Sequence, residues 1–391
     1  MNKCKKIKFY LNWKVLASAL GILFLYQTLA YNQGVLGDEI PEKTRKRRFE
    51  KKTQREDKSE TVVCGNCICE TGENKMNCRK DCGINPPPYH PEKQESMTYF
   101  DPIAKKEFTR SYMVHLPASY EPGTLAPVVI NFHGALGTGE SAEIGIGGMN
   151  KKSDEGGFIA VYPNAISKIG QPGRKQYWNA GTLVDVGAPN VDDVGFINAM
   201  LDKLEQDYSV DKKRIYATGI SNGAWMSYAV ACKLSERIAA IAPAAGGMIL
   251  EGCSPKEPVS IIHFHGTKDP GWPYNGGGSC WTDTIRSPIM ETISKWVELD
   301  GCSPTSNITY QKGDVTCKTY SSCAKGTEII FCTINGGGHA YPGGYTFPVE
   351  QVVKWDGDCA LGQNGNGVGK VSKDISALDA MWEFFKKHPK P

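Results

Sequence analysis

The second half of the chain contains the stretch Gly219-Ile220-Ser221-Asn222-Gly223, which has the pattern Gly-x-Ser-x-Gly. The β-branched and aromatic run 214–218 precedes it, and the run 224–231, which suits a helix, follows it. A strand, a tight turn and a helix are the setting in which this pattern forms a nucleophile elbow. Glycine is expected at both ends because the turn is strained and its neighbours approach closely. Taken alone, the pattern also fits an ordinary helix-entry loop that contains a serine.

The chain around this stretch alternates apolar runs with helical patterns. Segments expected to form strands occupy 108–116, 127–132, 158–162, 238–245, 259–264 and 327–334. Several are continuously apolar, as in parallel strands that are buried on both faces. A helix is expected from Asp192 or Asp193, whose carboxylates can cap it, to about Tyr208, and a last helix from about Asp374. This order predicts an α/β domain over 97–391 with a mainly parallel central sheet.

Composition and charge narrow the class of protein. The 391 residues suffice for one large domain and smaller pieces, and the 40% hydrophobic content is that of a globular protein. Residues 1–58 hold 14 Lys/Arg and 6 Asp/Glu, so the net charge of +3 leaves −5 on the remainder. An acidic body argues against nucleic acid as a partner. Fourteen cysteines favour an oxidising compartment.

Residues 1–31 are expected to be a signal peptide or a signal anchor. Lysines precede an apolar run over 15–29, which is short for a membrane span of about 20 residues and long for a signal-peptide core. Both alternatives predict an extracellular protein, either released or anchored to the membrane and facing outside. Residues 32–60 form a charged linker whose basic run could contact acidic lipid or cell-wall polymer.

A cysteine cluster over 61–83 resembles a short secreted module. Cys64, Cys69, Cys78 and Cys82 match its spacing, whereas Cys67 stands where the module has glycine. Thiolates at this spacing could also hold zinc or an iron–sulfur cluster, but outside the cytoplasm disulfides are favoured. We therefore predict a small disulfide-rich module, no metal and no cofactor. A Pro-rich linker over 84–96 follows it.

The residues that could activate Ser221 lie C-terminal to it. A serine is a weak nucleophile until a base removes its proton and a third group orients that base. In α/β-hydrolases the order along the chain is serine, acid, histidine. Asp269 and His339 each follow an expected strand, where functional side chains of such sheets gather. We predict Ser221, Asp269 and His339 as nucleophile, acid and base, because His263 and His265 lie within a strand.

Two N–H groups are expected to bind the negative oxygen that forms during acyl transfer. One belongs to Asn222, the residue after the nucleophile, and the other to the turn that follows the strand 127–132. In that turn Ala135 is the predicted donor and Leu136 is the alternative. His133 is expected to hold the loop rather than to take part in the chemistry.

Several motifs in a fixed order resemble the secreted serine esterases that include polyhydroxybutyrate depolymerases, feruloyl esterases and acetylxylan esterases, similar to carbohydrate esterase family 1. The matching segments are Phe132-His133-Gly134, Val191-Asp192-Asp193-Val194-Gly195-Phe196, Gly219-Ile220-Ser221-Asn222-Gly223, His265-Gly266-Thr267-Lys268-Asp269-Pro270 and Gly337-Gly338-His339-Ala340-Tyr341-Pro342-Gly343-Gly344. The resemblance implies an α/β-hydrolase fold, with helices on both faces of the sheet, and the triad Ser221, Asp269 and His339. The sequence departs from the group at Trp225 and in an insertion around 355–369 that contains Cys359.

Disulfide partners cannot be assigned from spacing alone. The resemblance implies a bond between Cys232 and Cys253 and another between Cys302 and Cys332. The short loop between Cys317 and Cys323 favours a bond between those two.

The resemblance implies a secreted or surface-anchored carboxylic ester hydrolase. Its substrate would be a feruloyl or acetyl ester of plant polysaccharide or a polyhydroxyalkanoate. The alternatives are a binding protein whose hydrolase fold no longer turns over and a serine peptidase. Aromatic residues near the strand ends could stack on a substrate ring or simply pack the loops; they are Trp178, Trp272, Tyr274, Trp281 and Tyr341. The sequence specifies no oligomeric state.

Overall fold

The computed structural model describes residues 93–167, 176–181, 190–280, 284–345 and 369–391. The predictions for the segments 1–31, 32–60 and 61–83, for most of the linker 84–96, and for Trp281 and Cys359 lie outside these residues. The first described strand begins at Lys93, before the domain boundary expected at 97.

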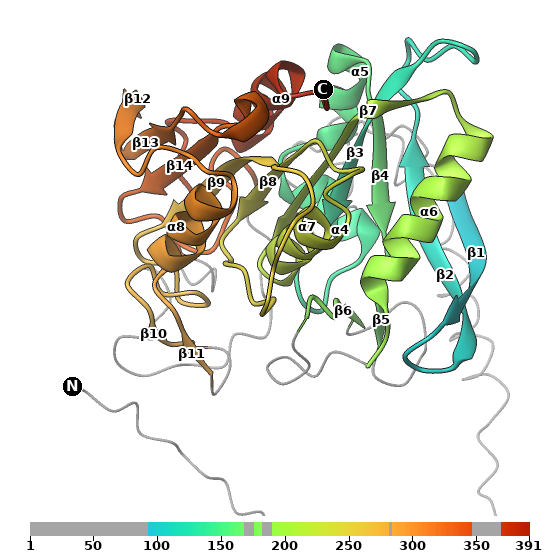
Figure 1. Cartoon of the computed structure of the whole chain (residues 1–391), viewed down its shortest axis with the longest axis horizontal. Helices are drawn as coiled ribbons and strands as arrows, with labels where there is room; N and C mark the ends of the chain where they lie inside the picture. The colour runs from blue at the N-terminus through green and yellow to red at the C-terminus, as the bar shows by residue number, and fades with distance from the viewer. Residues whose placement is uncertain (1–92, 168–175, 182–189, 281–283, 346–368) are drawn as a thin grey trace, which may run out of the picture. The chain divides into compact units, whose positions relative to one another are not determined.

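A ten-stranded sheet runs through the described residues in the order β1-β2-β4-β3-β7-β8-β9-β14-β13-β12 (Figure 1). Its strands are β1 (Lys93–Asp101), β2 (Lys106–His115), β3 (Ala126–Phe132), β4 (Ile159–Pro163), β7 (Val210–Ile220), β8 (Ala240–Ala244), β9 (Ser260–Gly266), β12 (Ser306–Lys312), β13 (Val315–Tyr320) and β14 (Ile329–Ile334). Neighbouring strands from β4 to β14 are parallel, and the pairs at both edges are antiparallel. The predicted parallel centre is confirmed, and the edges make the sheet mixed. Two short ribbons are β5 (Ile166–Ser167) with β6 (Gln176–Tyr177) and β10 (Gly277–Gly278) with β11 (Ile285–Arg286).

The burial of each strand follows its place in the sheet. Every residue of β3, β4, β8 and β9 is buried, because helices cover both faces of the centre. The edge strand β1 instead alternates between exposed and partly buried residues over most of its length. Continuous apolar runs therefore mark the centre of this sheet, and an alternating run marks its edge.

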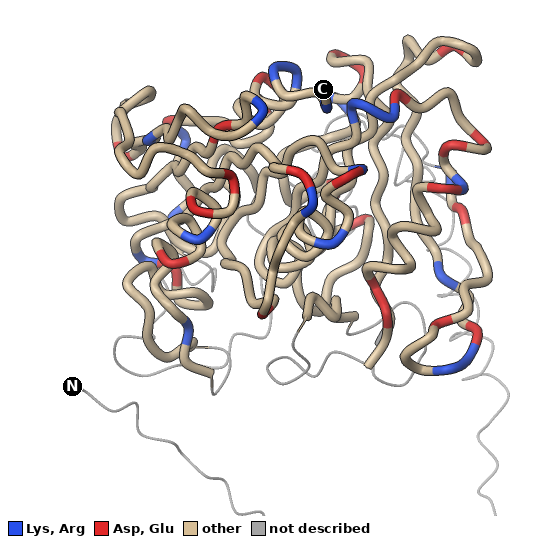
Figure 2. The backbone as a smooth tube through the Cα atoms, viewed as in Figure 1, with Lys and Arg blue, Asp and Glu red and all other residues tan. Residues whose placement is uncertain are grey.

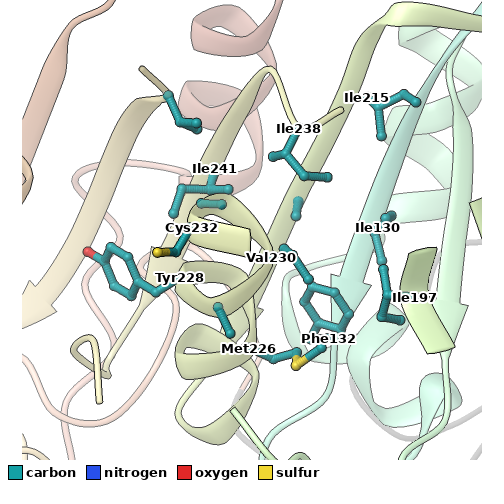
Figure 3. Packing of buried hydrophobic residues seen from close by; sticks show 14 of the residues in the cluster. Ile130, Phe132, Ile197, Ile215, Met226, Tyr228, Val230, Cys232, Ile238 and Ile241 are labelled. Carbon is teal, nitrogen blue, oxygen red and sulfur yellow. The ribbon is translucent and has the colours of Figure 1, made fainter. Parts of the chain in front are cut away.

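Helices on the two faces build two hydrophobic cores, which confirms the predicted layers. On one face lie α6 (Asp193–Asp207), α7 (Asn222–Lys233) and α8 (Ile289–Leu299), which share a core with the strands. Figure 3 shows Met226 and Val230 of α7 in this core, near Ile130 and Phe132 of β3. On the other face lie α4 (Gly139–Gly145), α5 (Met149–Gly156) and α9 (Ala377–Lys387).

Capping side chains set the helix ends. Asp192 caps α6 by accepting a hydrogen bond from the Gly195 N–H at 2.8 Å, so the helix expected from this position is confirmed. The last helix begins at Ala377, later than expected, because Ser376 provides the cap by accepting from the Asp379 N–H.

The disulfides correct two of the three expected pairs. Cys232 is bonded to Cys253 as expected. Cys317, however, is bonded to Cys332, because the two residues stand directly opposite each other on the antiparallel strands β13 and β14. Both expected pairs, Cys302 with Cys332 and Cys317 with Cys323, are wrong.

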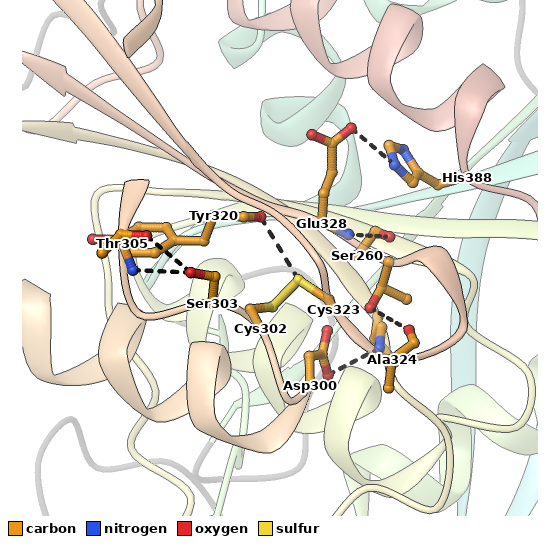
Figure 4. The surroundings of a disulfide bond; sticks show 12 residues. Ser260, Asp300, Cys302, Ser303, Thr305, Tyr320, Cys323, Ala324, Glu328 and His388 are labelled. Carbon is orange, nitrogen blue, oxygen red and sulfur yellow. Dashed lines mark hydrogen bonds and ion pairs between the residues drawn. A yellow bond between two sulfur atoms is a disulfide. The ribbon is translucent and has the colours of Figure 1, made fainter. Parts of the chain in front are cut away.

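A third bond joins Cys302 to Cys323 (Figure 4). Cys302 follows the end of α8, and Cys323 precedes the short 3-10 helix η1 (Ala324–Gly326). The short loop between Cys317 and Cys323 is misleading because most of it is strand β13, which carries Cys323 away from Cys317. Cys280 is also disulfide-bonded.

Charged residues of both signs are interspersed along the described backbone, as Figure 2 shows. Many of them form surface pairs, such as Lys203 with Asp207 at 2.8 Å and Arg237 with Asp202 at 2.6 Å. Within the described part of the chain, no helix combines the length and apolar character that crossing a membrane requires. The same residues contain no group of three or more metal-ligating side chains.

Candidate active site

Ser221 forms the turn between β7 and α7, as the elbow motif predicts. Its backbone has φ 59° and ψ −121°, a conformation that residues with a side chain rarely adopt. The turn is anchored on the sheet by the Ser221 N–H, which donates to the Ala244 carbonyl of β8 at 3.0 Å. The helix then begins at once, with the Trp225 N–H donating to the Ser221 carbonyl at 3.1 Å. The serine therefore stands at the carboxyl end of a parallel strand.

The two glycines of the motif are required by close backbone approach. A Cβ at Gly219 would meet the carbonyl of Gly223, which lies on the other side of the turn. A Cβ at Gly223 would meet the carbonyl of Phe132, at the end of the neighbouring strand β3. Neither atom is the end of a flexible side chain, so neither can move aside at low cost.

Asp269 and His339 come together at the same end of the sheet. Asp269 follows β9 and His339 follows β14, and these two strands are parallel neighbours. The Nδ1 atom of His339 lies 2.8 Å from Oδ1 and 2.9 Å from Oδ2 of Asp269. Oδ1 also accepts hydrogen bonds from the N–H groups of Gly271 and Trp272, at 2.8 and 2.9 Å. Both residues are buried.

Backbone contacts lock the loops of the acid and the base to each other. The Lys268 N–H donates to the Gly337 carbonyl at 2.9 Å, and a Cβ at Gly266 would meet that same peptide group. The Gly338 N–H donates to the Lys370 carbonyl at 2.9 Å. The relative position of Asp269 and His339 is therefore set by backbone as well as by their own hydrogen bond.

The charge state of Asp269 suits the role of an orienting acid. Burial raises the pKa of its carboxyl, but His339 and the Trp272 N–H lower it by more, so the pKa lies below its usual value. The carboxylate is thus ionised at neutral pH and accepts the proton at Nδ1 of His339. This tautomer makes Nε2 the basic nitrogen, as a serine hydrolase needs.

The histidines on β9 have structural partners. His265 Nε2 lies 2.8 Å from the Trp272 carbonyl, and its Nδ1 lies 3.2 Å from His263 Nε2. The other ring nitrogen of His263 lies 2.9 Å from the Tyr228 hydroxyl. Burial lowers the pKa of both histidines, so both rings stay neutral. They form a buried chain that supports the loop of Asp269, which agrees with their exclusion as the base.

His133 has a similar structural character. Its Nδ1 lies 2.7 Å from the Gly134 carbonyl, and its Nε2 accepts a hydrogen bond from the Ala165 N–H at 3.1 Å. Burial lowers the pKa of His133 to about 4, so the ring is neutral and can serve as donor and acceptor at once. Its surroundings are those of a loop-holding residue.

The turn that follows β3 lies against the elbow. A Cβ built on Gly134 would stand 3.7 Å from the Cβ of Ser221. In this turn the Leu136 N–H already donates to the Gln176 carbonyl at 2.8 Å, which disfavours Leu136 as an oxyanion donor. Ala135 and Asn222 remain the predicted donors. Asn222 is the first residue of α7, where helix N–H groups lack partners inside the helix.

Most of the loop aromatics are core residues. Trp178, Trp272 and Tyr341 are 1%, 3% and 3% exposed, so they pack the loops and do not offer an open stacking surface. Trp225 is also buried and packs edge-on against Trp272. The guanidinium of Arg286 lies 4.7 Å from the Trp225 ring and 5.1 Å from the Trp272 ring. Sequence reasoning missed Arg286, which no motif marks.

Sequence reasoning also missed the segment around Trp178. Its backbone is bonded to the side chain of Asn222, 44 residues away in the chain. No local pattern could have indicated this contact, because it joins two segments that are distant in the chain.

Comparisons with known proteins find a hydrolase family match and similar chains among esterases. Residues 116–275 match the dienelactone hydrolase family. Feruloyl esterase B of Piromyces equi is 32% identical over 241 residues, which cover 59% of this chain and 42% of that protein. Probable feruloyl esterase C of Aspergillus niger is 27% identical over 282 residues, which cover 71% of this chain and 83% of that protein.

A solved acetyl xylan esterase from Aspergillus awamori aligns with a TM-score of 0.46 at 17% identity, over 63% of this chain and 94% of that chain. The chain spans less than half the length of the Piromyces esterase that it matches. The family match covers residues 116–275, and the chain is similar to feruloyl esterases and to an acetylxylan esterase.

Proposed function

We propose that this protein is a serine carboxylic ester hydrolase with Ser221, Asp269 and His339 as its catalytic triad. The observation that carries the proposal is the buried contact of His339 Nδ1 with Asp269, at 2.8 and 2.9 Å, at the sheet end where the strained elbow presents Ser221. The esterase relatives support the same class of reaction. A catalytically silent binding protein would have no need for this combination.

In the proposed cycle, Ser221 Oγ attacks the ester carbonyl carbon while Nε2 of His339 takes the hydroxyl proton. The N–H groups of Asn222 and Ala135 stabilise the tetrahedral oxyanion, and Asp269 stabilises the imidazolium. His339 then protonates the leaving alcohol. Water, activated by the same histidine, attacks the acyl-enzyme and releases the acid and Ser221.

The substrate is proposed from the relatives. Their names describe feruloyl esterases and an acetylxylan esterase, so we propose an ester of plant polysaccharide, with polyhydroxyalkanoate as a further candidate. Rates measured on a feruloyl ester, an acetylated xylan and polyhydroxybutyrate would separate these three.

We propose that the protein acts outside the cytoplasm. The disulfides of the hydrolase domain support this location, because such bonds persist in oxidising compartments. The N-terminal segments expected to export or anchor it remain predictions, as does attachment to a membrane or cell wall.

The first test replaces the nucleophile. Ser221→Ala should reduce the rate of hydrolysis of a chromogenic ester at least about 1,000-fold, because the acyl-enzyme can no longer form. A fluorophosphonate probe should label the wild-type protein and not this variant. Ser321→Ala changes an exposed serine that directly follows β13. This variant should keep both ester hydrolysis and labelling by the probe. If folded Ser221→Ala hydrolyses the ester at the native rate, the proposal fails.

A further inference from the structure

The segment Gln176–Trp178 touches both turns that are expected to supply the oxyanion N–H groups. On the elbow side, the Trp178 N–H donates to Asn222 Oδ1 at 2.7 Å, and Asn222 Nδ2 donates to the Trp178 carbonyl at 3.0 Å. On the other side, Trp178 Nε1 donates to the His133 carbonyl at 3.1 Å, and the Gln176 carbonyl accepts from the Leu136 N–H at 2.8 Å. Four hydrogen bonds thus connect this one segment to both turns. We call residues 176–178 the oxyanion strut.

The oxyanion strut and its partners are buried away from solvent. Asn222, Trp178 and His133 are 0%, 1% and 0% exposed. Hydrogen bonds in such an interior are stronger than in water, and a polar group left without its partner there is costly. The Trp178 ring also packs edge-on against Phe132 and lies against His133, with ring centroids 5.3 and 5.0 Å apart. The contacts therefore fix the indole in position as well as the backbone.

Both turns need such support because each contains a strained residue. Ser221 has φ 59°, and Leu136, directly after the predicted donor Ala135, has φ 68°. Residues with side chains keep such conformations only when their surroundings over-determine them. The strut bonds Leu136 itself and Asn222, the neighbour of Ser221. It is thus well placed to keep both turns from relaxing.

We propose that the Asn222 side chain and Trp178 are positioning residues that set the spacing of the two oxyanion N–H groups. The inference rests on the proposed esterase function. Asn222 would then have two separable tasks: its backbone N–H binds the oxyanion, and its side-chain amide holds the strut. A substitution at Asn222 removes the second task and leaves the N–H in place. The reaction rate should therefore depend on a side chain whose hydrogen bonds are made to the Trp178 backbone.

The test compares two variants of the strut with a matched control. Asn222→Ala removes both hydrogen bonds of the side-chain amide. Trp178→Phe removes the indole N–H bond to His133 and part of the ring packing, and it keeps both bonds to Asn222. Trp296→Phe is the control, because Trp296 is a fully buried tryptophan of α8 whose Nε1 has no hydrogen-bond partner among the described residues. All three should be checked for folding by circular dichroism and thermal unfolding.

We expect kcat to fall about 10- to 100-fold in Asn222→Ala and by less in Trp178→Phe. KM should change less than about twofold, because a displaced N–H donor weakens binding of the transition state more than binding of the substrate. Binding of a trifluoromethyl ketone, which forms a tetrahedral adduct with the serine, should weaken in proportion to kcat. Trp296→Phe should leave both measurements unchanged.

The positioning role is overturned if either folded strut variant keeps the wild-type kcat and inhibitor affinity. It is also overturned if Trp296→Phe loses as much activity as Trp178→Phe, since the loss would then follow general destabilisation. If Asn222→Ala does not fold, Trp178→Phe decides by the same criteria. Failure of the proposed function gives a different result, in which wild-type protein and Ser221→Ala hydrolyse the ester equally.

Discussion

Ser221 has a backbone conformation that costs about 1–3 kcal/mol for a residue with a side chain. The glycines at 219 and 223 and the hydrogen bond to Ala244 hold it there. A relaxed turn would not present the hydroxyl beyond the sheet edge in the same way. The backbone is therefore strained at the residue where the proposed chemistry requires a sharp turn.

Asp269 offers a test of the proposed orienting role. Asp269→Asn keeps the size of the side chain but can donate to His339 Nδ1, which favours the wrong tautomer of the ring. We expect kcat to fall about 10⁴-fold with little change in KM, as for a triad that loses its carboxylate. Steady-state kinetics on a soluble chromogenic ester measures both constants. A folded variant with near-native kcat would remove Asp269 from the triad.

The parallel pair β9 and β14 is the element that brings acid and base together. Asp269 and His339 are 70 residues apart in the chain, but register pairs the end of β9 with the end of β14, Gly266 with Ile334. The loops that follow are then joined through the Gly337 carbonyl. Geometry at the site therefore depends on backbone packing at Gly266.

Gly266→Ala should separate these loops. Its Cβ would meet the Gly337 peptide, which cannot move without moving the His339 loop. We expect a loss of about 1–3 kcal/mol in the free energy of unfolding, typical of overpacking, together with a lower kcat. Urea unfolding and kinetics measure the two effects.

Gly278→Ala is the matched control, because a Cβ there meets no atom within 4 Å and the residue has no positive φ. It should leave stability and kcat within error of the wild type. Equal behaviour of the two alanine variants would contradict the packing argument at Gly266.

Stability of the whole molecule should depend on pH through Asp300. This residue follows α8 and lies near the Cys302–Cys323 disulfide (Figure 4). Its carboxyl is fully buried, and Oδ1 accepts from the Val259 N–H at 3.3 Å. Burial raises its pKa from 3.8 to about 7, although the Val259 N–H and Lys390 lower it in part. The folded state thus favours the protonated acid. The resulting contribution to stability is full below pH 3.8 and is lost as pH rises to about 7.

Asp300→Asn should remove this dependence, because the amide has no proton to lose. Relative to the wild type, the variant should be more stable at pH 8 than at pH 4.5, by about 3 kcal/mol. Urea unfolding at the two pH values measures the change. Glu251→Gln, at an exposed position, should show no comparable gain. A stability difference between Asp300→Asn and wild type that is the same at both pH values would contradict the assignment.

Much of the fold could be predicted because its signals are local. The continuous apolar runs at 127–132 and 259–264 correspond to β3 and β9, and Asp192 caps α6 as expected. The edge pairings could not be predicted, because strand order depends on contacts between distant segments. The same limit explains the error at Cys317: chain spacing pointed to Cys323, whereas cross-strand register selected Cys332.

The sequence by itself determined the candidate catalytic residues. The glycines of the nucleophile elbow lie beside the serine in the chain, and the order Ser221, Asp269, His339 can be read directly from the sequence. Only the tertiary structure decided which side chains meet. It paired His339 with Asp269, engaged His265 with the Trp272 carbonyl, and brought Trp178 against Asn222. The physical reason is separation along the chain. Turn strain and hydrophobic periodicity depend on residues a few positions apart, whereas hydrogen bonds between loops depend on the register of the whole sheet.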